Sequence, residues 1–156
     1  MKRSVYLDST VFNYLFDERA EFQTFRGITQ RWWDEERARH DVFVSEQTLA
    51  ELGEGDYPHK KQTLALLPEI PVLPRDGVLL EVARTYVDHF VMPRQVRGDA
   101  LHLAYASFYR MDVLLTWNCE HLANANKMQH IRVINARMGL MTPQIVTPIE
   151  LFEEGP

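Results

Sequence analysis

The stretch SVYLDSTVFNYLF, residues 4–16, decides the fold class of this 156-residue chain. It begins with a short apolar run of β-branched and aromatic residues, which is typical of a buried β-strand. Polar residues that favour helix starts follow at 8–10, and apolar side chains then recur at helical spacing. Asp8 therefore lies where a strand passes into a helix. In open α/β sheets, ligands bind at this end of the strands.

Strands and helices continue to alternate along the rest of the chain. Apolar runs predict further strands at 42–44, 70–73, 113–115, 131–134 and 145–146. Helical patterns fall between the strands, at 21–39, 46–53, 58–67, 77–91 and 100–109. This order predicts a three-layer α/β fold with a central, mainly parallel sheet flanked by helices. Because no repeat or linker interrupts the pattern, we expect one domain over residues 1–156.

The composition excludes some classes of protein. Cys119 is the only cysteine, which excludes an internal disulfide framework and fits the reducing cytoplasm. No apolar run approaches the roughly 20 residues that span a bilayer, so we expect no membrane partner. The formal net charge of −5 is not the basic footprint of a typical nucleic-acid-binding protein. It does not exclude one, because acidic groups that hold a cation would also make the total negative.

Three carboxylates and one amide occupy similar places in this pattern. Asp8 follows the first strand, Glu51 lies in the helix after the second, Asp99 starts the helix at 100–109, and Asn118 follows the strand at 113–115. Because the segments beyond parallel strands share one edge of the sheet, we expect these side chains to converge. Clustered carboxylates repel one another unless a cation compensates. Oxygen ligands of this kind suit Mg²⁺ or Mn²⁺.

Each of these residues also has a purely structural explanation. Asp8 and Asp99 suit helix N-caps, Glu51 suits a solvated helix face, and Asn118 suits a turn. It is their joint placement that favours a functional site, because capping and turn formation do not require it.

Two other α/β classes place an acidic residue after the first strand. A haloacid-dehalogenase-type phosphatase needs a second Asp two residues later, where this chain has Thr10. A receiver domain needs a phosphate-accepting Asp after the third strand, where this chain has Leu73-Pro74-Arg75. Neither class fits the sequence.

Four segments, VYLDSTVFNYL, SEQTLAEL, GDALHLAYAS and LLTWNCEHLAN, resemble the PIN-domain nucleases, and especially the VapC-like toxins of type II toxin–antitoxin pairs. They span nearly the whole chain in the family's order. The resemblance implies a PIN fold, a divalent-metal site and hydrolysis of RNA that leaves a 5′-phosphate and a 3′-hydroxyl. It aligns Asp8, Glu51 and Asp99 with the family's three acidic positions, which implies that they are catalytic and hold the metal. The partners that it implies are RNA, a cognate antitoxin and a second copy in a homodimer.

The sequence departs from the family at Asn118, where many members have an Asp. An amide can coordinate a metal through its oxygen or orient a water molecule, so Asn118 stays in the catalytic set. It brings no charge, however, which weakens the case for a second metal. The alternative function is a catalytically weakened PIN-like scaffold that binds RNA or protein.

Substrate binding at an acidic site needs further groups. Arg94 and Arg97 precede Asp99 and are candidates for contacts with RNA phosphates, which position RNA without reading its sequence. Thr10 and Asn13 follow the first strand and are candidates for hydrogen bonds to Asp8, to metal-bound water or to substrate.

Other side chains have no assigned chemistry. We expect His102, one turn after Asp99, to be buried and hydrogen-bonded rather than to act as a general base. The bulky residues Phe22, Phe25, Trp32 and Trp33 suit helix packing or, in a toxin, an apolar groove for the antitoxin.

Overall fold

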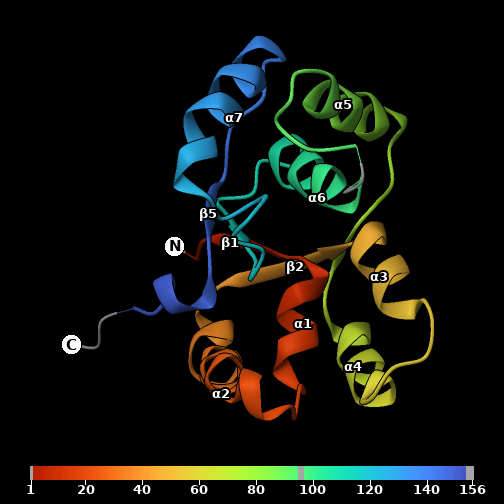
Figure 1. Ribbon diagram of the computed structural model, residues 1–156, viewed down its shortest axis with the longest axis vertical. Helices are drawn as coiled ribbons and strands as arrows, with labels where there is room; N and C mark the ends of the chain where they lie inside the picture. The colour runs from red at the N-terminus through yellow and green to blue at the C-terminus, as the bar shows by residue number, and fades with distance from the viewer. Residues whose placement is uncertain (1, 95–96, 154–156) are drawn as a thin grey trace.

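The computed structural model describes residues 2–94 and 97–153, without the side chain of Arg97 (Figure 1). Its sheet has five strands in the order β3-β2-β1-β4-β5. The strands are β1 (Ser4–Leu7), β2 (Asp41–Ser45), β3 (Val72–Leu73), β4 (Val113–Leu115) and β5 (Gln144–Val146). All four strand pairs are parallel, and Val5 lies opposite Val42 on one side and Val113 on the other. The carboxyl ends of the strands therefore share one edge, as predicted.

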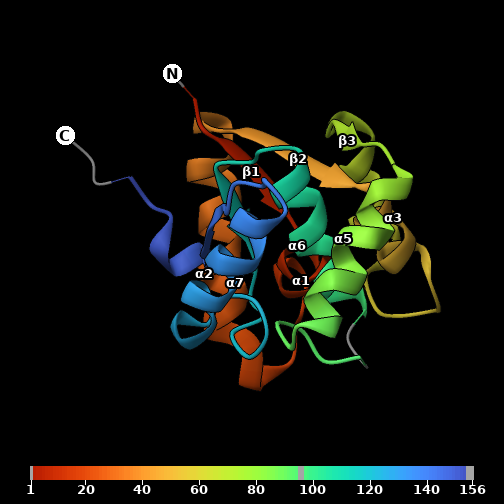
Figure 2. The same ribbon diagram turned by 90° about the horizontal axis from the view of Figure 1, so that it is seen from above.

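Helices cover both faces of this sheet. The α-helices of the described residues are α1 (Ser9–Leu15), α2 (Gln23–Arg31), α3 (Glu46–Gly53), α4 (Lys60–Leu66), α5 (Gly77–Asp88), α6 (Arg97–Phe108) and α7 (Ala125–Arg137). Short 3₁₀ helices lie at Ala20–Phe22, Arg37–Arg39, Leu67–Glu69 and Pro148–Glu150. Helices α5, α6 and α7 lie on one side of the sheet and α1, α2 and α4 on the other (Figures 1 and 2). The predicted three-layer α/β architecture is confirmed. No helix in the described ranges is long and apolar enough to cross a bilayer.

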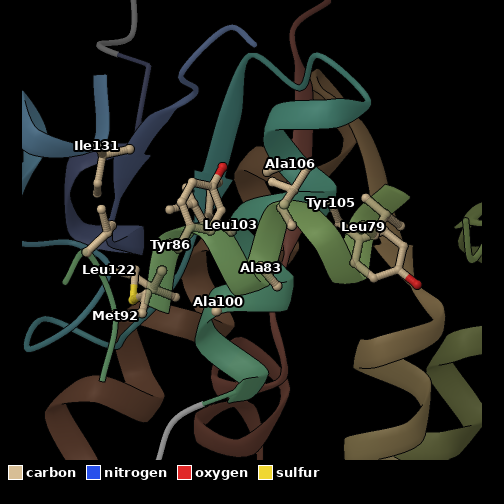
Figure 3. Close-up of a cluster of buried hydrophobic side chains, with 14 of the residues drawn as sticks. Leu79, Ala83, Tyr86, Met92, Ala100, Leu103, Tyr105, Ala106, Leu122 and Ile131 are labelled. Carbon is tan, nitrogen blue, oxygen red and sulfur yellow. The ribbon is translucent and has the colours of Figure 1, made fainter. Parts of the chain in front are cut away.

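Alternating strand residues divide the core in two. Tyr6 and Leu114 pack with α5, α6 and α7 in one cluster, part of which Figure 3 shows. Val5, Leu7 and Leu115 point to the opposite face and pack with α1 and Trp32. Period-two alternation in a sheet that is covered on both faces explains why these strands are apolar at nearly every position.

The strand predicted at 131–134 is wrong, because this segment lies inside α7. Ile131 and Ile134 are both buried, whereas Val133 between them is 39% exposed. Burial three residues apart is a helical pattern, and Asn124 begins the helix by accepting a hydrogen bond from the Asn126 amide at 3.0 Å. A run of four apolar and charged residues is too short to distinguish the helical period of 3.6 residues from the strand period of two.

The segment predicted to be helical at 21–39 is helical throughout, although it is not one regular α-helix. Helix α2 ends at Arg31, and a π-helical turn at Trp32–Glu36 and the 3₁₀ turn at Arg37–Arg39 follow it. Trp32 is fully buried, and its indole N–H donates to the Leu151 carbonyl at 2.9 Å. The predicted strand at 70–73 shortens to β3, because the 3₁₀ turn at Leu67–Glu69 precedes it.

Candidate functional site

Asp8 lies at the carboxyl end of β1 and is almost fully buried, with 1% of its surface exposed. Its Oδ1 accepts a hydrogen bond from the Thr10 amide at 3.0 Å, so Asp8 is the N-cap of α1. The Thr10 hydroxyl donates to the same oxygen and the Thr116 hydroxyl to Oδ2, both at 2.5 Å. A side chain can cap a helix while it is exposed to water. The capping role of Asp8 therefore does not explain why its side chain is buried.

Asp99 approaches the same edge of the sheet from α6. The helix begins at Arg97, so Asp99 lies in its first turn, and the expectation that Asp99 is an N-cap is wrong. Asn118, beyond β4, donates from Nδ2 to Asp99 Oδ2 at 2.8 Å. The Asn118 amide N–H in turn donates to Thr116 Oγ1 at 2.9 Å. Hydrogen bonds therefore connect Asp8 to Asp99 through Thr116 and Asn118.

Glu51, on α3, is half-buried and already has polar partners. His102 Nε2 lies 2.7 and 2.9 Å from its two carboxylate oxygens, and the Ser9 hydroxyl donates to Oε1 at 3.0 Å. Gly98 allows this approach, because a Cβ at that position would lie 3.2 Å from Glu51 Oε2. His102 is buried and hydrogen-bonded, as expected, and its Nδ1 is 2.5 Å from the Tyr6 hydroxyl.

The electrostatics divide the carboxylates into two kinds. Burial raises the pKa of Asp8, and it also raises the pKa of Asp99. Burial acts on Glu51 in the same direction, but the hydrogen bond and charge of His102 outweigh it and lower the Glu51 pKa. Burial would lower the pKa of His102, but Glu51 outweighs that effect and raises it. Glu51 and His102 therefore form a charge-balanced pair.

Asp8 and Asp99 have no such ion-pair partner in the part of the chain that the structure describes. Within the described ranges, the ion pairs include neither of these carboxylates. A buried carboxylate and a half-buried one, neither of them in an ion pair, are unfavourable close together, and a divalent cation would compensate both. Carboxylate oxygens are the donors that Mg²⁺ and Mn²⁺ prefer. The donor chemistry therefore fits such an ion.

The described side chains do not form a complete metal site as they stand. Among them, no group of three or more His, Cys, Asp or Glu residues is placed to hold an ion. Glu51 turns toward His102, and Asn118 presents an N–H donor to Asp99 rather than a free oxygen, since its Oδ1 accepts from the His121 amide at 3.0 Å. Of the four predicted site residues, Asp8 and Asp99 are therefore the two whose carboxylates could ligate a cation.

The candidate substrate residues lie in different places. Thr10 belongs to the hydrogen-bond network of Asp8, whereas Asn13 is exposed one turn further along α1. Arg94 is exposed and lines a groove between α5 and α6 with Ala100 and Leu101, so the structure does not place it among the carboxylates. Arg97 begins α6, but its side chain lies outside the described part of the chain.

The large aromatic residues pack onto one another. Trp32 is in the core, and Trp33 packs edge-on against Phe12 at 5.6 Å between ring centroids. Phe22 and Phe25 both pack around Tyr14. Helix packing, one of the two expected roles, accounts for these contacts.

Sequence reasoning missed the residues that connect the site. Thr116 joins Asp8 to Asn118, and the Trp117 amide donates to Thr10 Oγ1 at 2.9 Å. Tyr6 holds His102 from inside the sheet. The position of Thr116 could have identified it as a site residue, because it directly follows the strand residues Leu114 and Leu115 at the edge where ligands bind.

Comparisons with known proteins identify the fold. No family model and no curated protein sequence matches the chain. The solved structure of VapC20, a sarcin–ricin-loop-cleaving toxin of Mycobacterium tuberculosis, has 14% sequence identity and a TM-score of 0.55, over 75% of this chain and 92% of that one. VapBC2 from Rickettsia felis, bound to a DNA fragment from its promoter, has 12% identity and a TM-score of 0.60, over 92% of this chain and 98% of the matched one. The chain has a VapC-like PIN-domain fold, as the resemblance implied.

Proposed function

We propose that this chain is a divalent-metal-dependent endoribonuclease formed by one PIN-like domain over residues 1–156, and that it is the toxin of a type II toxin–antitoxin pair in the cytoplasm. One observation carries the proposal. Asp8 and Asp99 are held in one hydrogen-bonded network at the carboxyl edge of the sheet, and no ion pair of the described residues balances either of them. A divalent cation would supply the charge that they lack.

In this proposal, Asp8 and Asp99 hold Mg²⁺ or Mn²⁺, and Glu51 is the third acidic residue of the site. When bound, the ion would lower the pKa of a water ligand and offset charge on the attacked phosphate. Thr10 and Thr116 fix the rotamer of Asp8 through their hydroxyls. Asn118 fixes Asp99 in the same way.

Glu51 supplies a carboxylate that stays ionised at neutral pH, because His102 lowers its pKa. Its hydrogen bonds to His102 and Ser9 hold it at one orientation at the edge of the site. From there it can accept a hydrogen bond from water. Hydrolysis breaks the bond between phosphorus and the 3′-oxygen, which leaves a 5′-phosphate and a 3′-hydroxyl.

The solved structures with this fold support the proposed substrate and partner. VapC20 is described as a toxin that cleaves the sarcin–ricin loop, and VapBC2 as bound to promoter DNA. By analogy we propose RNA as the substrate and a cognate antitoxin as a partner, with a homodimer as the assembly.

The test is cleavage of single-stranded RNA by the purified chain with Mn²⁺, Mg²⁺ or EDTA. Cleavage should require the metal and should fall by about 100-fold or more in Asp8→Asn and in Asp99→Asn. Asp41→Asn is the matched control, because Asp41 is an exposed carboxylate at the start of β2, on the opposite edge of the sheet. Equal cleavage by all four proteins would point to a contaminating nuclease and would contradict the proposal.

A catalytically weakened scaffold is the second candidate function. Two observations favour it: Asn118 brings no charge, and Glu51 is occupied by His102. This function predicts RNA retention in a filter-binding assay with no cleavage under any metal condition.

A further inference from the structure

A hollow of about 640 Å³ lies beyond the carboxylates, between the end of α1 and the start of α4. Its lining includes Asn13 and Phe16 from the α1 side and Tyr57 and His59 from the segment before α4. Figure 1 shows α1 and α4 on the same side of the sheet. None of these four residues takes part in the hydrogen bonds of Asp8 or Asp99 described above.

One face of α1 leads from the acidic site to this hollow. Ser9 donates to Glu51, Asn13 follows four residues later, and Phe16 follows three residues after that. Ser9 and Asn13 are four residues apart and therefore lie on one face of α1, and Phe16 is the C-cap residue at the end of this helix. On the opposite wall, α3 carries Glu51, and the carbonyl of Leu52, the next residue, accepts a hydrogen bond from the Tyr57 hydroxyl at 2.6 Å. Helix α1 contacts Glu51 through Ser9, and α3 carries Glu51 itself. Both helices therefore connect the acidic site to the hollow.

Aromatic rings of the hollow are held in place. Phe16 and His59 lie with their ring centroids 6.4 Å apart at an interplanar angle of 32°. His59 has a left-handed backbone with φ of 66°, which is uncommon for a residue other than Gly. Its carbonyl accepts from the Thr63 amide at 3.0 Å, so the first turn of α4 fixes this strained conformation. All three rings, those of Phe16, Tyr57 and His59, are only half-buried.

The charges of the hollow suit an uncharged group better than a phosphate. Asp17 and Glu18 contribute carboxylates, and the guanidinium of Arg19 is tied to Asp17 by several hydrogen bonds. His59 Nε2 lies 3.6 Å from Glu18. Asn13, in contrast, is an exposed amide with both donor and acceptor atoms.

From this geometry we propose that the hollow binds an unpaired nucleobase of single-stranded RNA, close to the phosphate that the acidic site would cleave. The base stacks on the rings of Phe16, Tyr57 and His59, and its edge hydrogen-bonds with Asn13. Proteins recognise single-stranded RNA through aromatic side chains and the base edges in this way. The inference deepens the proposed nuclease function and rests on it for the choice of ligand.

The test is binding of short, fluorescein-labelled, single-stranded oligoribonucleotides, measured by anisotropy in an Asp8→Asn background so that no RNA is cut. One abasic nucleotide is moved along the strand. At one position it should weaken binding by about 10-fold, the loss expected for one stacked base. Phe16→Leu should weaken binding of the intact strand to the same extent and should remove the effect of the abasic position.

Two further variants keep the test decisive. His59→Asn removes a ring but keeps a residue that tolerates the left-handed backbone, so it folds even where a bulkier change would not. It should reproduce the result of Phe16→Leu. Phe90→Leu is the control, since Phe90 is 90% exposed and lies outside the hollow. It should leave Kd unchanged.

The inference is overturned if Phe16→Leu and His59→Asn bind RNA as tightly as the parent. It is also overturned if the abasic nucleotide weakens binding to these two variants as much as it weakens binding to the parent. In that case the hollow would be assigned to a protein segment, such as one from an antitoxin. These results are separate from a failure of the proposed nuclease, which would appear as no metal-dependent cleavage by the chain with Asp8 intact.

Discussion

Asn118 Nδ2 donates a hydrogen bond of 2.8 Å to Asp99 Oδ2, while Asn118 Oδ1 accepts one from the His121 amide. The side-chain amide of Asn118 therefore serves as a hydrogen-bond donor through Nδ2 and as an acceptor through Oδ1. An aspartate at this position would present an oxygen to the Asp99 carboxylate in place of a donor. Asn118 thus has a positioning role of its own, whatever charge the position has in other proteins.

The first prediction concerns Asn118→Asp. Without metal, this variant should have a lower melting temperature than the parent at pH 8, by about 3 °C for roughly 1 kcal/mol, because two carboxylates would then face each other. Addition of Mn²⁺ should raise its melting temperature by more than it raises that of the parent. Thermal unfolding in EDTA and in Mn²⁺ measures both effects. Identical melting curves in EDTA would mean that the Asn118–Asp99 contact is not formed.

The second prediction is that Asp8→Asn stabilises the metal-free chain. The pKa of Asp8 is raised in the folded protein, so the ionised form lowers stability at every pH above that folded pKa. Asn keeps the N-cap and carries no charge. The variant should be more stable by about 1 kcal/mol at pH 8, and the difference should shrink as the pH falls through the folded pKa of Asp8.

Urea unfolding in EDTA at pH 8 and at pH 5 measures this difference. Asp76→Asn is the matched control, because Asp76 is also an N-cap, on α5, but is exposed. It should show no gain in stability at either pH. A loss of stability in Asp8→Asn would show that the carboxylate is not under electrostatic stress.

The third prediction concerns the pair of His102 and Glu51. The pKa of His102 is raised on folding, so its contribution to stability is full below about pH 6.5, the ordinary value for His, and is lost as the pH rises through the folded pKa. The pKa of Glu51 is lowered, so its contribution is present above about pH 4.3 and is lost as the pH falls through the folded value. The pair stabilises most between these limits.

His102→Gln should therefore cost about 2 kcal/mol near pH 5.5 and less at pH 9. The measurement is the free energy of unfolding of parent and variant at both values. A cost that does not change with pH would mean that His102 stabilises the fold by packing alone.

The fourth prediction uses the close approach of Gly98 to Glu51. In Gly98→Ala, the new Cβ would lie 3.2 Å from Glu51 Oε2, so the carboxylate must move by a few tenths of an ångström. RNA cleavage should fall by about 10-fold, while stability should hold or rise, because Ala favours a helix by up to about 1 kcal/mol over Gly.

Gly77→Ala provides the comparison, since Gly77 is the first residue of α5 and nothing lies within 4 Å of its added Cβ. It should gain the same helix stability with no loss of cleavage. Equal cleavage rates in both variants would contradict the proposal that Glu51 belongs to the catalytic site.

The sequence by itself determined the fold class and the edge at which the acidic residues lie. Short apolar runs flanked by helix starts identify β1, β2 and β4, because strand burial on both faces needs apolar side chains at successive positions. The residue types at 8–10 also predicted that Asp8 begins α1, since capping depends on a few neighbouring residues.

The tertiary structure alone decided which side chains are partners. Glu51 and His102 are 51 residues apart, and Thr116 and Asp8 are 108 apart. No local pattern encodes such pairs, because they depend on how α3, α6 and β4 pack around β1. The same reason explains the error at 131–134. A run that fits either period becomes helix or strand according to the surface it can cover, and here that surface is the core beside α6.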